Sequence, residues 1–387
     1  MVKMQSWEQL TAVKHGPGVL ANLGAEVRRL GGRKPLVVTD QGVVKAGLLE
    51  RVTAVLEKES IAYALFDQVK GNPPVELVGE GTRAYQAAGA DMLIAVGGGS
   101  SIDTAKAIGV EVVHEGCILD YEYGHQEITR RIPPLIAIPT TAGTGSEVTL
   151  WAVITDPRRK IKFNVGGTPL IGPHVALVDP ELLTGLPPHL TAWTGLDALS
   201  HAIECYTCAY AQPITDAVAL LAIEYLGQYL RRAVAYGQDI EARYKVAMAA
   251  TLAGMSYGVD SAGAVHAMAQ TFGGYIDVHH GYLTAVMLPV VMAYNWMGCP
   301  ERYGRIAQAM GENISGLKVN DAARLAVKAV TELVADLEIP PLGSTGVTEA
   351  DLPELARLAY EDPQTIGNPR DIDYEGYLKL YRQLLAQ

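Results

Sequence analysis

One aspartate and three histidines in the second half of the chain have the types and spacing of metal ligands. Asp197 and His201 are four positions apart in a helical stretch, so their side chains share one face and can hold one ion. His266 and His280 stand among apolar residues and glycines, where an unpaired imidazole is costly. As a set, one carboxylate and three imidazoles suit a divalent transition metal such as Fe²⁺ or Zn²⁺. Taken singly, the first pair is also typical of an ordinary helix, and each of the other two of a hydrogen-bonded core histidine.

A glycine turn in the first half is a candidate phosphate site. Five small residues lie between the apolar run 92–96 and the helical run 102–109: Gly97, Gly98, Gly99, Ser100 and Ser101. Glycines let the backbone approach a ligand closely, and a helix N-terminus offers unpaired N–H groups and a positive dipole end. A plain strand-to-helix turn, capped by Ser100 or Ser101, explains the same residues. The G-x-G-x-x-G fingerprint is absent, so this turn alone does not decide between the two interpretations.

Two further strand ends carry polar side chains. The loop after the apolar run 135–139 is also a candidate phosphate site, because it begins with hydroxyl side chains and glycines. Its candidate contacts are Thr140, Thr141 and Thr144. Because open parallel sheets bind ligands at the carboxyl ends of their strands, the two loops together favour a phosphate. Asp40 ends the run 35–40, where a carboxylate accepts hydrogen bonds from a ribose and repels a 2′-phosphate, which favours NAD over NADP. Asp40 equally suits the cap of a helix that begins near Gly42.

The elements that must position these residues differ between the two halves of the chain. In the first half, continuous apolar runs predict strands buried on both faces: 35–40, 92–96, 135–139 and 176–179. Beyond residue 186, long alanine- and leucine-rich stretches have helical spacing: 216–230, 241–257, 320–337 and 352–359. We therefore predict an α/β dinucleotide-binding domain with a mainly parallel sheet, residues 1–186, followed by an all-α domain, residues 187–387.

Composition excludes several classes of protein. The 387 residues include 42 acids and 31 Lys or Arg, so the formal net charge of −11 disfavours a nucleic-acid partner. No stretch approaches the ~20 apolar residues of a membrane helix, and the first residues do not resemble a signal peptide. The 4 cysteines are too few for a disulfide framework, and a reducing cytoplasm fits best.

The remaining cysteines and histidines indicate no second site. Cys205 and Cys208 have C-x-x-C spacing without a second pair, and packing of small side chains on a helix is favoured over a redox or metal pair. Five histidines in polar or proline-bearing segments are expected at the surface: His15, His114, His125, His174 and His189. The chemistry is thus expected at the candidate metal ligands of the second half and at the polar strand ends of the first half.

Taken together, these motifs are similar to those of one family in order and spacing. The glycine turn 97–103, the run 139–149, the pair Asp197 and His201, and the two later histidines all match it. The chain resembles the iron-containing (group III) alcohol dehydrogenases over nearly its full length. The resemblance implies an architecture like that of dehydroquinate synthase, with NAD(P) on the N-terminal domain, the metal on the helical domain and the active site in the cleft between them.

The resemblance also implies a set of site residues. The metal ligands carry over as Asp197, His201, His266 and His280. The cofactor contacts carry over as Asp40, Asn72, Gly97, Gly98, Gly99, Ser100, Thr140, Thr141, Thr144 and Lys162. Asn72 and Lys162 enter only through the family, since no pattern in the sequence singles them out. Relatives usually assemble as homodimers or larger homo-oligomers, which we expect here as well.

One position departs from the family. Many members have a second histidine four residues after the third ligand, thought to help relay a proton, where this chain has Gln270. An amide does not exchange a proton at neutral pH as an imidazole does. Proton release then passes through water, the nicotinamide ribose or the neighbouring His279. The last of these is expected only if its ring faces the metal held by His280.

The function implied is the reversible oxidation of a small primary alcohol or diol to its aldehyde. Hydride passes between the carbinol carbon and NAD, and the metal, Fe²⁺ before Zn²⁺, acts as the Lewis acid. A dehydroquinate synthase-like lyase, also NAD- and metal-dependent, is the alternative, although the helices around the ligands lack the basic cluster that a phosphorylated sugar acid requires. A noncatalytic NAD-binding scaffold is a third reading, which the full set of ligands argues against.

Overall fold

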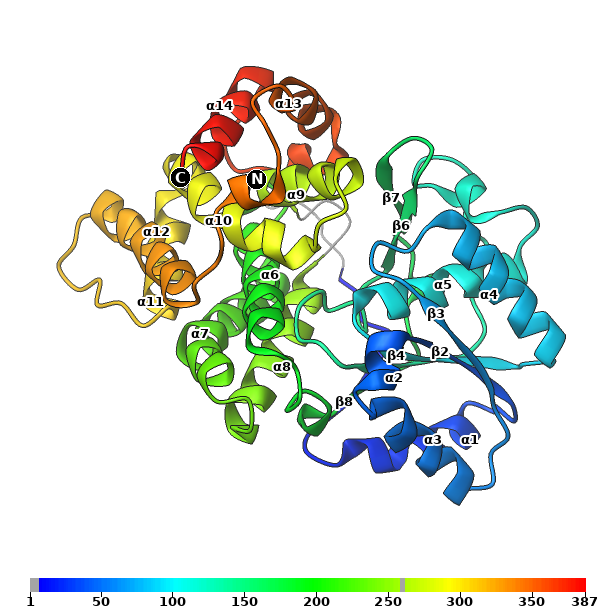
Figure 1. Cartoon of the computed structure of the whole chain (residues 1–387). Coiled ribbons are helices and arrows are strands. Elements are labelled where there is room, and N and C mark those ends of the chain that lie inside the picture. Colours follow the sequence, from blue (N-terminus) through cyan, green and yellow to red (C-terminus); the bar gives the residue numbers. More distant parts are fainter. Residues whose placement is uncertain (1–6, 258–261) are drawn as a thin grey trace. The chain divides into compact units, whose positions relative to one another are not determined.

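The computed structural model describes residues 7–257 and 262–387. By its internal contacts, the chain divides into two compact units (Figure 1). One unit contains residues 8–186, and the other contains residues 187–387 together with Trp7. Each unit has its own architecture and is described by itself.

A six-stranded parallel sheet forms the centre of the first unit. Its strand order is β1-β8-β5-β4-β2-β3, and every pair of neighbours is parallel. The strands are β1 (Ala12–His15), β2 (Pro35–Asp40), β3 (Ala64–Val69), β4 (Met92–Gly97), β5 (Leu135–Pro139) and β8 (Val175–Val178). The predicted fold class, an α/β unit with a mainly parallel sheet followed by a helical region, is confirmed.

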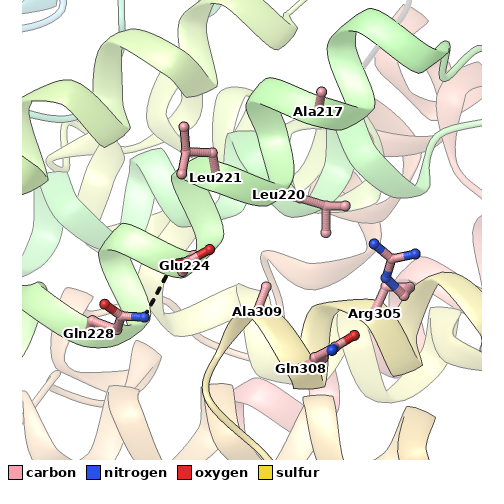
Figure 2. Close-up of a pocket in the computed structure, with 8 residues that line it drawn as sticks. All are labelled: Ala217, Leu220, Leu221, Glu224, Gln228, Arg305, Gln308 and Ala309. Carbon is pink, nitrogen blue, oxygen red and sulfur yellow. Dashed lines mark hydrogen bonds between the residues drawn. The ribbon is translucent and has the colours of Figure 1, made fainter.

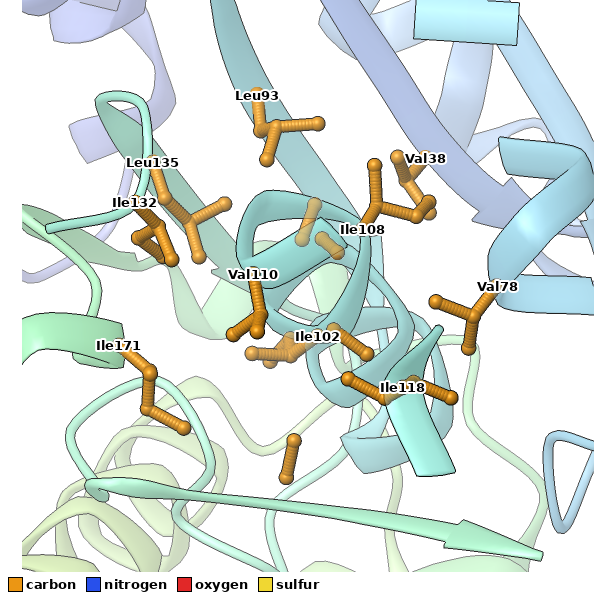
Figure 3. Packing of buried hydrophobic residues seen from close by; sticks show 14 of the residues in the cluster. Val38, Val78, Leu93, Ile102, Ile108, Val110, Ile118, Ile132, Leu135 and Ile171 are labelled. Carbon is orange, nitrogen blue, oxygen red and sulfur yellow. The ribbon is translucent and has the colours of Figure 1, made fainter. Parts of the chain in front are cut away.

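The apolar runs are continuous because both faces of the sheet are covered. Along β4, Leu93 and Ala95 pack into one hydrophobic cluster, whereas Ile94 and Val96 pack into another. Successive side chains of a strand point to opposite faces, so burial on both faces requires apolar residues at every position. Figure 3 shows the first cluster, where Leu93 of the sheet faces residues such as Ile108. The helices of this unit are α1 (Leu23–Arg29), α2 (Gln41–Lys45), α3 (Leu48–Lys58), α4 (Val75–Ala88) and α5 (Gly99–Val113).

Four of the observed strands were not predicted, and one predicted strand begins at a slightly different residue. β1 and β3 were not predicted, and β6 (Trp151–Asp156) pairs with β7 (Ile161–Gly166) in a separate antiparallel hairpin. Burial alternates along β6, as expected for a strand with one covered face, so it lacks the continuous apolar run that marks the central strands. The last predicted strand, 176–179, begins one residue earlier, at Val175.

The second unit is helical, and none of its described residues forms a strand. Its helices are α6 (Pro188–Thr207), α7 (Pro213–Ala235), α8 (Ile240–Ser256), α9 (Ala264–Tyr275), α10 (His280–Asn295), α11 (Pro300–Ala309), α12 (Val319–Asp336), α13 (Leu352–Glu361) and α14 (Tyr374–Leu385). α6 is central and packs against α7, α8 and α10. Gly195 permits the close approach of α7, because a Cβ there would lie 2.3 Å from Leu230 Cδ1. In the part of the chain that the structure covers, no helix has the length and apolar character needed to cross a membrane.

A fully buried lysine fastens the loop between β5 and β6 to α5. Lys106 Nζ donates to Ser146 Oγ at 2.9 Å, to Thr149 O and Oγ1 at 3.1 Å each, and to Trp151 O at 2.6 Å. Burial lowers the pKa of Lys106 to about 8, although the nearby carboxylates of Asp103 and Glu147 oppose the shift. The acceptors offset the cost of burying the ammonium group and hold the polar loop in place.

We predict that Lys106→Met destabilises the protein. The variant leaves the acceptors of Lys106 buried without a donor, so the free energy of unfolding should fall by about 3 kcal/mol in urea titrations. The exposed Lys58, substituted in the same way, is the control and should change stability by less than about 0.5 kcal/mol. Equal stability of the two variants would contradict the anchoring role of Lys106.

The pH dependence of the effect of Lys106→Met on stability tests the lowered pKa of Lys106. The pKa of Lys106 is about 8 in the folded protein against 10.5 for a free lysine, so between these values the unfolded chain binds more protons than the folded chain. The contribution of Lys106 to the free energy of unfolding therefore rises as the pH rises through this window. The stability difference between wild type and Lys106→Met should widen by about 1–2 kcal/mol between about pH 7.5 and 9.5. A constant difference would contradict the lowered pKa.

Candidate metal centre and cofactor loops

One face of α6 carries three buried ionisable side chains. Asp197, His201 and Glu204 are spaced by four and three positions, which places them one above another on the helix. Their exposed fractions are only 2%, 8% and 4%. The expected sharing of a face by Asp197 and His201 is observed, and the carboxylate of Glu204 continues the same row.

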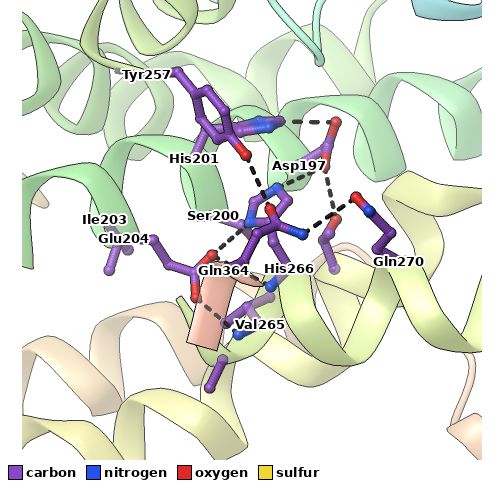
Figure 4. Close-up of polar contacts among 12 residues, drawn as sticks. Asp197, Ser200, His201, Ile203, Glu204, Tyr257, Val265, His266, Gln270 and Gln364 are labelled. Atoms are coloured by element: carbon purple, nitrogen blue, oxygen red, sulfur yellow. Dashed lines mark hydrogen bonds and ion pairs between the residues drawn. The ribbon is translucent and has the colours of Figure 1, made fainter. Parts of the chain in front are cut away.

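The third side chain of the cluster comes from α9. His266 approaches the α6 row, and the ligand atoms of Asp197, His201 and His266 all lie within 4.8 Å of one another (Figure 4). His201 Nδ1 lies 4.0 Å from Asp197 Oδ2, and His266 Nε2 lies 3.9 Å from Asp197 Oδ1. These separations are too long for hydrogen bonds but leave the three groups converging on one point. They form a candidate metal site.

His280 lies beside this cluster at the start of α10. Its Nε2 is 3.6 Å from Asp197 Oδ1, and its ring centroid is 5.6 Å from that of His266. One turn further along α10, Thr284 donates a hydrogen bond of 3.0 Å to Asp197 Oδ1. Sequence reasoning missed Thr284, whose only signal is its position four residues after a predicted ligand. The structure thus places the other three expected ligands close to Asp197, while coordination by each of the four stays a prediction.

Two buried imidazole nitrogens test whether a cation fits here. Among the described residues, His201 Nδ1 and His266 Nε2 have no hydrogen-bond partner although both atoms are buried. A buried nitrogen without a partner is costly and rare, and a cation satisfies the lone pair of a neutral imidazole. The donor set of one carboxylate and imidazoles is one that divalent transition metals accept. The residues therefore fit a metal ion.

The pKa values of Asp197 and His201 agree with this fit. Burial opposes ionisation of Asp197, but His201, His280 and His266 outweigh it and hold the pKa of Asp197 below its ordinary range. Burial, assisted by His266, lowers the pKa of His201 to about 4, so this imidazole is neutral near pH 7. The cluster therefore offers an ionised carboxylate and a neutral imidazole, which are the protonation states that bind metals.

Glu204 is a second functional residue that sequence reasoning missed. It accepts hydrogen bonds from Val265 N at 2.7 Å and from His266 N at 3.3 Å, and His266 Nδ1 donates to its Oε2. Burial lowers the pKa of His266, but the charges of Glu204 and Asp197 more than offset this and raise it. A carboxylate three positions after a predicted ligand on the same helix face was the available signal.

Gln270 lies one turn after His266 on α9 and is held by a chain of hydrogen bonds. Gln364 Nε2 donates to Gln270 Oε1 at 3.2 Å, and Tyr257 OH donates to Gln364 Oε1 at 2.9 Å (Figure 4). The ring of Tyr257 stands edge-on to His201, with centroids 5.3 Å apart. The amide therefore has one defined orientation beside the ligands.

His279 is arranged differently. It precedes α10 as its N-cap residue, its side chain is exposed, and its ring centroid lies 5.3 Å from that of Trp193. Of the two neighbouring histidines, His280 is the one with an atom close to Asp197. A proton-relay role for His279 stays a prediction.

In the first unit, the predicted cofactor residues gather at the carboxyl ends of adjacent strands. Asp40 ends β2, Asn72 follows β3, Gly97 ends β4 and Thr140 follows β5. Thr140 N donates to Gly97 O at 3.0 Å, and Ser101 Oγ donates to Asp40 Oδ2 at 3.1 Å. The ends of β4 and β5 are thus joined directly, and Ser101 of α5 ties the end of β2 to the helix that follows β4.

The glycine turn and the threonine loop pack without room for side chains between them. A Cβ on Gly98 would lie 3.0 Å from Thr141 Oγ1, and one on Gly99 would lie 2.7 Å from Thr144 Cγ2. Gly97 has φ of +151°, which few other residues adopt. The N-cap of α5 is Gly98, without a side-chain cap, so the alternative of a serine cap is wrong. The N-terminus of α5 keeps its N–H groups available for an anion.

Asp40 has the capping role that was one of its two interpretations. Its Oδ1 accepts from Gly42 N at 2.8 Å and from Val43 N at 3.0 Å, which begins α2. A ribose contact by the same carboxylate stays a prediction. Lys162 lies on β7 opposite Thr155, whose N donates to Pro73 O at 2.9 Å, so the hairpin is fastened beside the segment that contains Asn72.

The structure also places the cysteine pair and one histidine that the sequence assigned to no site. Cys205 and Cys208 are buried and are not joined in a disulfide, and burial raises the pKa of Cys208 to about 11, which agrees with a packing role. His174 was expected at the surface but is only partly exposed: burial lowers its pKa to about 4, and its ring nitrogens lie 3.2 Å from Leu135 N and 2.9 Å from Arg131 Nε, of which a neutral ring accepts from one.

A hollow of about 500 Å³ lies between α7 and α11 (Figure 2). Leu220 and Leu221 line it, and Glu224 and Arg305 are its two charged residues. None of the predicted site residues lines this hollow. It therefore belongs to neither of the two groups described above.

Comparison with known proteins identifies the family. The model described as "Iron-containing alcohol dehydrogenase" matches residues 11–180, and that described as "Fe-containing alcohol dehydrogenase family, C-terminal" matches residues 191–385. A choline dehydrogenase of Bacillus subtilis is 53% identical over 385 residues, which are 99% of this chain and 96% of the relative. An NAD-dependent methanol dehydrogenase of Bacillus methanolicus is 41% identical, over 92% of this chain and 93% of its own.

The fold agrees with these matches. A crystal structure of a 1,3-propanediol oxidoreductase superposes with a TM-score of 0.95 at 40% identity, covering 99% of this chain and 100% of the other. The sequence identity and the fold thus extend over both units, the candidate metal site included. The chain belongs to the iron-containing alcohol dehydrogenase family and is an alcohol or diol oxidoreductase.

Proposed function

We propose that this chain catalyses the reversible, NAD-linked oxidation of a small primary alcohol or diol to its aldehyde, with Fe²⁺ as its metal. The main support is the buried cluster of Asp197, His201 and His266, which contains two imidazole nitrogens without hydrogen-bond partners among the described residues. In this proposal, residues 1–186 bind the dinucleotide and residues 187–387 hold the metal and the substrate. We expect a homo-oligomer in the cytoplasm.

The metal would be held by Asp197, His201, His266 and His280. Bound there, a divalent ion supplies Lewis-acid chemistry that lowers the pKa of the substrate hydroxyl. Thr284 orients the carboxylate of Asp197 through its hydrogen bond to Oδ1. Zn²⁺ accepts the same ligands, and the iron in the family's name favours Fe²⁺.

The proton of the alcohol does not leave through Gln270. An amide does not exchange protons at neutral pH, and the hydrogen bond from Gln364 fixes its orientation. We assign Gln270 a positioning role: its uncharged amide lies one turn from His266 and borders the proposed metal site. Water, the nicotinamide ribose and His279 are the candidate routes for the proton.

The dinucleotide would lie along the carboxyl ends of the parallel strands. The uncapped N-terminus of α5 and the glycine turn Gly97, Gly98, Gly99 and Ser100 suit the pyrophosphate. The threonine loop of Thr140, Thr141 and Thr144 lines the same edge, and Asn72 and Lys162 flank it. Asp40 would accept hydrogen bonds from the ribose and disfavour the 2′-phosphate of NADP.

The charges around the cluster favour a cationic alcohol among the possible substrates. Three carboxylates act on His266, namely Glu204, Asp197 and Asp362. Their negative charge near the proposed metal site favours a substrate cation. The relative that is 53% identical is named choline dehydrogenase, and choline is such a cation. Choline is therefore the first substrate that we propose, ahead of the short neutral alcohols and diols.

Turnover should depend on the ligands. His266→Ala and His280→Ala should each lose at least about 10³-fold in NADH formation with iron-loaded, anaerobic enzyme, while NAD affinity stays within about twofold. The exposed His125, replaced by alanine, is the control. Wild-type rates in either ligand variant would refute the metal assignment. Release of inorganic phosphate from a sugar acid phosphate without net NADH would favour the lyase instead.

A matched pair of substrates tests the charge of the site. Choline and 3,3-dimethylbutan-1-ol have nearly the same shape, but only choline is charged. We expect kcat/KM for choline to be at least about tenfold higher, which corresponds to about 1.4 kcal/mol of electrostatic stabilisation. Equal values would show that the carboxylates do not act on the substrate, while leaving the dehydrogenase activity itself intact.

Cofactor choice should depend on the charge of Asp40. Asp40→Asn keeps an oxygen that caps α2 but removes the negative charge, so the preference for NAD over NADP should fall by about tenfold in kcat/KM. Asp239→Asn, which alters the N-cap of α8 in the other unit, is the matched control. An unchanged preference in Asp40→Asn would leave Asp40 as a helix cap alone.

A further inference from the structure

Glu204 is a buried carboxylate that is not among the expected metal ligands. It stands on the same face of α6 as Asp197 and His201, and only 4% of it is exposed. A buried carboxylate is costly unless hydrogen bonds compensate its charge. The partners that compensate Glu204 therefore indicate what it does.

The partners belong to the start of α9. Oε1 accepts from Val265 N at 2.7 Å, Oε2 accepts from His266 N at 3.3 Å, and His266 Nδ1 also donates to Oε2. The first N–H groups of a helix have no partner within the helix, and an N-cap side chain usually satisfies them. Here the N-cap is Gly263, which has no side chain, and a Cβ there would lie 2.8 Å from Glu204 Oε1. Glu204 therefore caps α9 from another helix.

The third contact has a chemical consequence for His266. A carboxylate only accepts, so the hydrogen bond to Glu204 places a proton on Nδ1 and leaves the lone pair of a neutral ring on Nε2. Nε2 is buried, has no partner among the described residues and lies 3.9 Å from Asp197 Oδ1. The nitrogen that can bind a metal is thus the one that faces the other ligands.

We propose that Glu204 is a positioning residue of the metal centre, which orients His266 with Nε2 toward the ion and ties the N-terminus of α9 to α6. The inference rests on the metal centre of the proposed function. Through this one carboxylate, the ligands of α6 and the ligand of α9 are held in one rigid group. Partners of this kind, which accept from the second nitrogen of a histidine ligand, tune metal affinity.

Glu204→Gln tests the proposal with little change of shape. An amide has one oxygen and one donor group, so it cannot accept from both backbone N–H groups and from Nδ1 as the carboxylate does. Co²⁺, titrated into the metal-depleted full-length protein against a competing chelator, should bind the variant about 10–100-fold more weakly than wild type. The absorption bands of bound Co²⁺, which report ligand geometry, should also change.

Asn368→Ala separates positioning from helix capping. Asn368 Oδ1 accepts from Ala264 N at 3.2 Å, so it caps the same helix end, and none of its hydrogen bonds goes to His266. This variant should lose thermal stability but bind Co²⁺ with wild-type affinity and wild-type absorption bands. If Glu204→Gln unfolds at a lower temperature and yet binds Co²⁺ as tightly as wild type, Glu204 is a structural cap only and the proposal fails.

A measurement on the wild-type protein decides the case if Glu204→Gln does not fold. In a crystal structure with Zn²⁺ bound, Nε2 of His266 should contact the ion and Nδ1 should face Glu204. Coordination through Nδ1, or a water between Nδ1 and Glu204, would overturn the proposal. Wild-type protein that binds neither Co²⁺ nor Zn²⁺ would instead refute the metal centre and the proposed function with it.

Discussion

The structure of the helical unit depends on the burial of two carboxylates on one face of α6. Asp197 and Glu204 are almost inaccessible to water, so each must find positive or donating groups within the protein. Asp197 has Thr284 and the nearby His280 of α10, and Glu204 has the first N–H groups and the imidazole of α9. This requirement brings α6, α9 and α10 together and makes the centre of the unit polar. The same charges favour a cation there.

The parallel sheet provides a second point of convergence by a different route. Strands of a parallel sheet all end at one edge, so the loops that follow them meet whatever their separation in sequence. In this chain they meet closely: only glycine at positions 98 and 99 leaves space for Thr141 and Thr144. Lys106 of α5 then anchors the loop between β5 and β6 through hydrogen bonds to buried acceptors. Precise loops over a rigid sheet are what an extended dinucleotide requires.

Gln270 lies one turn after His266 on α9, at the position where the resemblance implies a histidine in many family members. Its amide is embedded in a chain with Gln364 and Tyr257, and the ring of Tyr257 packs edge-on against His201. The chain orients the amide, and burial raises the pKa of Tyr257 well above its ordinary value, so its hydroxyl stays protonated near pH 7. In the proposed function, positioning and proton transfer, which one histidine can combine, are therefore separate.

The sequence by itself determined the fold class and the groups of residues with chemistry, because hydrophobic periodicity and i, i+4 spacing are local properties of the chain. The central strands and Asp197 with His201 were predictable for this reason. The half-buried β6 hairpin, the partly buried His174 and the roles of Glu204 and Thr284 were not, since each is defined by a partner far away in sequence. Only the tertiary structure decided that His266 presents Nε2 to Asp197, because that choice depends on which nitrogen a carboxylate on another helix occupies.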